Sequence, residues 1–176
     1  MEEIDNTLED KGAYYETKAG KYKVRVAKDT KQDGTLKYSD GEISIEWNYL
    51  GAEGRNSSVQ EDREWHTGAK ALTRVVYGEA EPGTDIEYTI IGEDVKENII
   101  VREKREEYRY QFELRLTGVE PRVSEDGMSI EFYKREGEKV AQMPAPYMYD
   151  ACGERSESVY YELEEREGKY AFTVVA

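Results

Sequence analysis

Apolar and polar residues alternate along most of this chain. The clearest stretch is residues 108–116, where every second residue is apolar and those between are charged or polar. A period of two puts successive side chains on opposite faces of an extended chain, so the stretch is predicted to be a β-strand with one buried face. Phe112 lies at its centre and is expected to face the core.

The alternation recurs in segments separated by turn residues. Residues 21–26 and 43–49 both show it, and Trp47 occupies an apolar position in the second. The pair Asp40-Gly41 stands between residues 35–38 and 42–50, which favours a tight hairpin. Further hairpins are predicted around residues 92–94 and 164–169. We expect ten to twelve short strands in all, as about that many alternating runs are present.

The pattern predicts a mainly β fold. It is antiparallel and β-sandwich-like, with two adjoining β lobes as an alternative and little helix. Residues 1–12 are acidic and predicted to be a tail, linker or frayed helix. Lobe one is placed at residues 13–117, and lobe two at 118–176, packed on the first. The last strand stops without a turn, so lobe two is expected to be truncated at its C-terminal end.

Residues 143–150 read Met-Pro-Ala-Pro-Tyr-Met-Tyr-Asp. Pro144 and Pro146 cannot continue a helix, because each lacks an N–H and holds its predecessor in an extended conformation. The segment is predicted to cross between two β-rich parts, with Tyr147 and Tyr149 free to fill a core. These four residues, with Phe112 and Trp47, are the expected structural residues.

The charge of the chain limits the kinds of partner that it is expected to bind. Its 176 residues include 39 acidic and 25 basic side chains, for a net charge of -14. This acidity argues against nucleic acid, whose phosphates attract clustered Lys and Arg. No apolar run reaches the roughly 18 residues of a membrane span, so membrane insertion is not expected. No signal peptide opens the chain, and the single cysteine, Cys152, excludes an internal disulfide.

The sequence contains few residues that could form a catalytic site. His66 is the only histidine, so any Ser-His-Asp or Cys-His arrangement would have to include it. With 39 acidic residues, neighbouring carboxylates arise by chance, and the acidic turn at residues 29–34 lacks the ligand spacing of a calcium loop. We therefore expect no enzyme activity, no metal site and no cofactor.

Aromatic residues are the candidates for binding. Residues 51–68 form the longest irregular segment and contain Trp65 and His66. Long loops often carry function, and exposed aromatic rings stack on sugars, so Trp65, His66 and Tyr49 are proposed as glycan contacts. Trp47 lies within an apolar alternation and is expected in the core instead.

Several segments together resemble a known family. These are residues 70–101, then 112–118, 130–132 and 144–150, in this order. They are similar to the N-terminal β-rich region of secreted, wall-associated Rhs/YD-repeat proteins of Gram-positive bacteria, including the polymorphic-toxin type. Members of that family continue beyond the point where this chain stops.

The resemblance implies an extracellular or cell-wall-associated domain of a larger chain, with the adjacent domains of that chain as partners. On this basis we expect a non-catalytic structural or interaction module of a bacterial surface protein. A carbohydrate-binding β-sandwich, with cell-wall or host glycan as ligand, is the alternative. A hydrolase built on His66 or a carboxylate pair is a third reading.

Overall fold

The computed structural model describes residues 4–30, 35–51, 56–62 and 72–176. These residues form β-strands joined by turns, in four antiparallel sheets. The expectation of a mainly β, sandwich-like fold with little helix is confirmed. The described residues contain seventeen strands, more than the ten to twelve expected, because several are only two to four residues long.

An eight-stranded sheet is the largest part of the fold. Its strands run in the order β1-β2-β3-β4-β5-β10-β17-β16. Their bounds are β1 Asp5–Asp10, β2 Tyr14–Ala19, β3 Lys23–Ala27, β4 Leu36–Ser39, β5 Ser44–Tyr49, β10 Arg109–Thr117, β17 Lys169–Val175 and β16 Tyr160–Arg166. Strand β10 joins the first five strands to the final hairpin, since it pairs with β5 on one side and β17 on the other.

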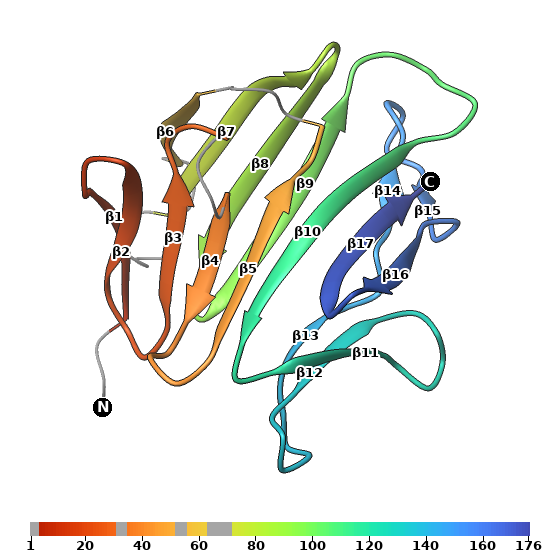
Figure 1. Cartoon of the computed structure of the whole chain (residues 1–176). Coiled ribbons are helices and arrows are strands. Elements are labelled where there is room, and N and C mark those ends of the chain that lie inside the picture. Colours follow the sequence, from red (N-terminus) through yellow and green to blue (C-terminus); the bar gives the residue numbers. More distant parts are fainter. Residues whose placement is uncertain (1–3, 31–34, 52–55, 63–71) are drawn as a thin grey trace.

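The remaining strands form three smaller sheets. A four-stranded sheet contains β6 Ser57–Asp62, β7 Leu72–Glu81, β8 Thr84–Ile91 and β9 Asp94–Val101. A three-stranded sheet contains β11 Glu120–Val123, β12 Ile130–Tyr133 and β13 Lys139–Met143, and a short hairpin contains β14 Met148–Tyr149 and β15 Arg155–Ser156. Figure 1 shows the four-stranded sheet against the β1–β5 half of the large sheet, and the smaller sheets near its β10–β17–β16 half.

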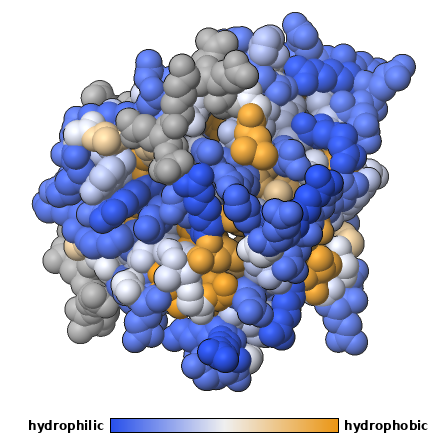
Figure 2. All heavy atoms as spheres, viewed as in Figure 1, coloured by the Kyte–Doolittle hydropathy of each residue, from blue (hydrophilic) through white to orange (hydrophobic). Residues whose placement is uncertain are grey.

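The core lies between the large sheet and the sheets that pack on it. Strand β10 turns Tyr110, Phe112 and Leu114 inward, all at most 4% exposed, as its alternation predicted. The four-stranded sheet contributes Tyr77, Ile86, Tyr88 and Ile90 to the same cluster, and β12 contributes Ile130 and Phe132. The outer surface is different: Figure 2 shows a mostly hydrophilic face with separate hydrophobic patches.

Glycines at the predicted turns have the required backbone. Gly41 has a φ of 96° and joins β4 to β5, which confirms the Asp40-Gly41 hairpin. Gly92 has a φ of 61° in the turn between β8 and β9. Both angles lie in the left-handed region that glycine adopts without steric cost. The final hairpin, β16 with β17, is also confirmed.

Two segments differ from expectation. The N-terminal acidic segment, expected as a tail, linker or frayed helix, contains strand β1, which pairs with β2. Two of its acidic residues form ion pairs with lysines: Asp10 with Lys28 at 2.6 Å, and Asp5 with Lys18 at 3.9 Å. The division into lobes at residue 117 stays a prediction, and the large sheet takes strands from both sides of it.

The second difference concerns Tyr147 and Tyr149. They were expected to fill a core, but their exposed fractions are 45% and 59%. The reason is local, because β14 and β15 contain only two residues each and pair with no other strand in the described part of the chain. Residues 144–147 do connect β13 to this hairpin, and the Tyr161 hydroxyl donates to the Pro144 carbonyl at 3.1 Å.

None of the described residues belongs to a helix with the length and hydropathy that a membrane span requires.

Candidate functional site

The outer face of strands β2, β3 and β4 carries a group of cationic side chains. On β3, Val24 and Val26 face the core, so Lys23 and Arg25 point outward. Strand β4 continues the row, because Arg25 pairs in register with Lys37, and Lys23 with Ser39. The period of two that buries the valines therefore places these three cations on one surface.

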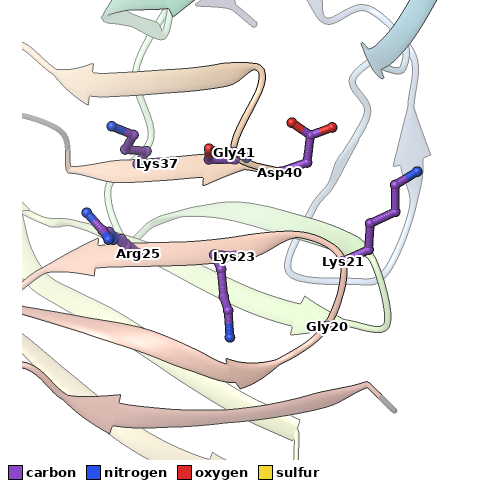
Figure 3. A pocket seen from close by; sticks show the side chains of 8 residues that line it. Gly20, Lys21, Lys23, Arg25, Lys37, Asp40 and Gly41 are labelled. Atoms are coloured by element: carbon purple, nitrogen blue, oxygen red, sulfur yellow. Dashed lines mark hydrogen bonds between the residues drawn. The ribbon is translucent and has the colours of Figure 1, made fainter. Parts of the chain in front are cut away.

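These cations line a pocket of about 390 Å³, which we call the basic pocket. Its charged lining residues are Lys21, Lys23, Arg25, Lys37 and Asp40. Figure 3 shows Arg25 and Lys37 at one end on neighbouring strands, and Lys21 and Asp40 at the other end near the turns. The lining thus carries four cations and one carboxylate, in a protein whose net charge is -14.

Neighbouring groups hold the cations in place. Arg25 makes an ion pair with Glu16 on β2, and this hydrogen bond raises the pKa of the guanidinium. The ammonium of Lys23 donates to the carbonyls of Lys18 at 2.7 Å and Thr17 at 3.2 Å. Lys37 has a looser ion pair, with its Nζ 3.9 Å from a Glu46 oxygen. The positive charge is therefore partly offset by Glu16 and Glu46.

Asp40 has a structural role in the pocket. Its carboxylate accepts the backbone N–H groups of Glu42 and Ile43, both at 2.9 Å. These bonds lower the pKa of Asp40, and the bond from Ile43 is the largest cause. A carboxylate that stays ionised at neutral pH is a weak general base, so the basic pocket can bind an anion but lacks a proton acceptor tuned to neutral pH.

A second titratable group lies between the sheets. Glu97 on β9 accepts a hydrogen bond from the indole N–H of Trp47 on β5, with a nitrogen–oxygen distance of 3.3 Å. Burial raises the pKa of Glu97 to about 7, and the neighbouring Tyr88 and Trp47 side chains oppose this rise only in part. A carboxyl with such a pKa can hold or release a proton near neutral pH.

The predicted glycan contacts are not brought together. Trp65 and His66 lie outside the described residues. Tyr49 is 3% exposed, and its hydroxyl donates to a Glu81 oxygen at 2.6 Å. The prediction that Tyr49 could stack on a sugar is wrong, because β5 turns this side chain into the core.

The other predicted residues have structural positions. Phe112 is fully buried, and its ring stacks on Phe172 with 4.8 Å between centroids. Trp47 is half-buried and packs against the core cluster. Cys152 is an exposed free thiol in the β14–β15 turn. Among the described residues, no group of three or more His, Cys, Asp and Glu side chains could hold a metal ion.

Sequence reasoning missed the basic pocket. The signal was present, since residues 11–28 contain six cations and one acid, a net charge of +5 in a chain of -14. Only the pairing of β3 with β4 shows that Lys37 joins them.

The chain is similar to two curated proteins from Bacillus subtilis. It is 30% identical over 109 residues to "tRNA nuclease WapA" of strain 168. It has the same identity over the same length to "tRNA(Glu)-specific nuclease WapA" of the natto strain BEST195. Each match covers 58% of this chain and 5% of the relative, so the chain corresponds to about a twentieth of the length of the proteins it matches. No protein-family model and no solved structure matches the chain.

These relatives correct the functional expectations. We expected a non-catalytic structural or interaction module, with a carbohydrate-binding module as the alternative, and no enzyme activity. Similarity to proteins named as nucleases contradicts all three expectations. The sequence alone did not indicate this similarity, and the matched segment is about a twentieth of the length of each relative.

Proposed function

We propose that this chain acts in an RNA-cleaving protein whose substrate is tRNA. The observation that carries the proposal is the 30% identity to two tRNA nucleases, which extends over 58% of this chain. A match of this length includes several strands, so it is more than the recurrence of one short motif.

Cleavage of a phosphodiester has three chemical requirements. The phosphate must be held and its developing negative charge stabilised, one group must accept a proton, and another must supply a proton to the leaving oxygen. Among the described residues, the basic pocket offers cations for the first requirement. Glu97 is a carboxyl suited to proton transfer, because its pKa is about 7.

These two features do not form one centre. Lys23, Arg25 and Lys37 lie on the outer face of the large sheet, whereas Glu97 bonds to Trp47 between the sheets. We therefore assign RNA cleavage to the protein in which this chain acts and name no catalytic residue within the described part.

The place of this protein in the cell belongs to the same proposal. The resemblance to wall-associated Rhs/YD-repeat proteins implies an extracellular or cell-wall location and contacts with adjacent domains of one chain. Both remain predictions, and the location can be checked by fractionating the source cells with an antibody against this chain.

A cleavage assay tests the proposal. The chain, and separately any longer protein that contains it, would be incubated with purified tRNA and with a ribosomal RNA fragment as substrate control, and the products separated on a denaturing gel. Discrete tRNA fragments, absent with heat-denatured protein, would support the proposal. Intact tRNA with every form of the protein would overturn it. Cleavage by the 176 residues alone would place the reaction within this chain.

A further inference from the structure

We infer that the basic pocket on β3, β4 and the adjoining turns is a binding site for the phosphodiester backbone of RNA. The inference deepens the proposed function, since RNA as the ligand rests on it. The pocket itself rests on geometry: four cationic side chains and one carboxylate line a cavity of about 390 Å³.

The charge distribution supports this site although the whole protein is acidic. Residues 11–28, which include β2 and β3, carry a net charge of +5, whereas the chain as a whole carries -14. Salt screens charges beyond roughly 8–10 Å, so a phosphate in the pocket responds mainly to the nearby cations. The net acidity of the whole chain argues against nucleic acid as a partner, whereas the local charge of this segment favours it.

The arrangement of the cations suits a chain of phosphates. Lys23 and Arg25 are two residues apart on one strand, which places them roughly 6.6 Å apart on the same face. Lys37 lies directly across from Arg25 on β4. Cations at alternate positions along a strand match a ligand with regularly repeated charges better than they match a single small anion.

Individual side chains can reach a ligand from where they lie. The Arg25 guanidinium lies 4.8 Å from the centre of the Tyr14 ring and bonds Glu16 through its Nε, so its two terminal nitrogens can bind phosphate oxygens in a forked arrangement. The Lys37 ammonium lies 3.9 Å from a Glu46 oxygen, a loose pair that a phosphate can displace. Lys21 is exposed, and its hydrogen bond with Tyr22 raises its pKa, so it stays charged.

An acidic peptide is the competing ligand, because carboxylates also bind such cations. Similarity to tRNA nucleases favours RNA. The experiment therefore uses three labelled probes of equal charge: a 2′-O-methyl oligoribonucleotide, an abasic oligomer with the same backbone, and a polyglutamate peptide. The 2′-O-methyl group removes the 2′-hydroxyl nucleophile, which keeps binding separate from cleavage.

The test variant is K23Q/R25Q/K37Q, and K139Q/R166Q/K169Q is the control with the same charge change at sites outside the pocket. Binding is measured by fluorescence anisotropy over a range of salt concentrations. Each phosphate contact contributes about 0.7 to the slope of log affinity against log salt for a single strand, so three lost contacts should reduce the slope by roughly 2. Affinity should fall about tenfold in the test variant and much less in the control. Lys37→Gln alone is the second variant if the triple variant does not fold.

The outcomes separate this inference from the proposed function. The phosphate site is supported if both oligomers bind in a salt-dependent way and the pocket variant weakens this binding more than the control variant does. This holds even if the protein cleaves no tRNA. Equal binding by both triple variants overturns the site, even if tRNA is cleaved. If the wild-type protein binds the 2′-O-methyl oligomer but not the abasic oligomer, recognition of the backbone is overturned. If polyglutamate binds in the pocket more tightly than either oligomer, the ligand is an acidic peptide and not RNA.

Discussion

Trp47 on β5 donates its indole N–H to the Glu97 carboxylate on β9, 3.3 Å away, and so links the eight-stranded sheet to the four-stranded sheet. Tyr88, the register partner of Glu97, packs edge-on against Trp47 with 6.3 Å between the ring centroids. A carboxyl group therefore lies where two large aromatic side chains meet. Its burial makes the ionised form costly, which gives the packing of the sheets a dependence on pH.

Glu97→Gln is expected to change how stability depends on pH. The folded pKa of about 7 exceeds the ordinary glutamate value of 4.5, so the folded state holds a proton that the unfolded state releases between these values. Stability from this group is fully present below pH 4.5 and is lost as the pH rises to 7 and above. The loss is about 3 kcal/mol, since each pKa unit corresponds to 1.36 kcal/mol.

Glutamine at position 97 does not titrate, so the variant should not lose this stability as the pH rises. Its stability relative to wild type should therefore be greater at pH 8 than at pH 5. Urea unfolding at both pH values measures the difference. Glu93→Gln, at the exposed β8–β9 turn, is the control. Parallel pH profiles for wild type and Glu97→Gln would contradict the assigned pKa.

Phe112→Ala is expected to cost about 3–5 kcal/mol, because it leaves a cavity in a closely packed core. Phe112 is fully buried and its ring is nearly parallel to that of Phe172, with 6° between the planes. Tyr149→Ala is a matched control in which an aromatic side chain is removed from a position that is 59% exposed. Chemical denaturation should show a large loss only for Phe112→Ala, and a small loss would place the Phe112 ring outside the core.

The sequence predicted those strands and turns that are determined by neighbouring residues. The alternation across residues 108–116 and the Asp40-Gly41 pair are local signals, and β10 and the β4–β5 hairpin follow them. Strand β1 escaped prediction because its acidic residues do not favour a strand on their own. Its stability comes from pairing with β2 and from cations such as Lys28, which lies 18 residues away from its partner Asp10.

The candidate site was harder to predict for a similar reason. Lys23 and Arg25 alternate with Val24 and Val26 in the sequence, but a single strand does not define a pocket. The pocket appears only when β4 brings Lys37 beside Arg25. The exposure of Tyr147 was also unpredictable from composition, since an aromatic ring is usually buried and only the short hairpin leaves this one in solvent.

Tyr49→Phe should weaken the link between β5 and β7. The Tyr49 hydroxyl donates to Glu81 at 2.6 Å, and the same carboxylate accepts from Arg105 at 2.7 Å. These two hydrogen bonds lower the pKa of Glu81 against the opposing effect of burial, which is the largest single influence. A folded pKa below the ordinary value stabilises the protein above that value, and this stabilisation is lost as the pH falls.

Without the Tyr49 hydroxyl, the pKa of Glu81 should rise, and stability near pH 7 should fall by about 1–3 kcal/mol. Thermal unfolding at pH 7 and pH 4 measures both effects, and the difference between variant and wild type should shrink at the lower pH. Tyr160→Phe, which removes a hydroxyl from an exposed ring, serves as the control. A difference that is the same at both pH values would mean that the hydroxyl does not act through the Glu81 carboxylate.

Gly118→Ala and Gly41→Ala form a pair that separates backbone strain from crowding. Both glycines have left-handed backbones, with φ of 73° and 96°, so alanine at either position should cost roughly 1–2 kcal/mol. Only at Gly118 would the added Cβ also lie 3.1 Å from the Glu42 carbonyl oxygen, whereas it would meet nothing within 4 Å at Gly41. Gly118 follows β10 and precedes β11, so crowding there would shift the three-stranded sheet against the large one. Equilibrium unfolding should therefore show a larger loss for Gly118→Ala than for Gly41→Ala, and equal losses would mean that the backbone near Glu42 yields without cost.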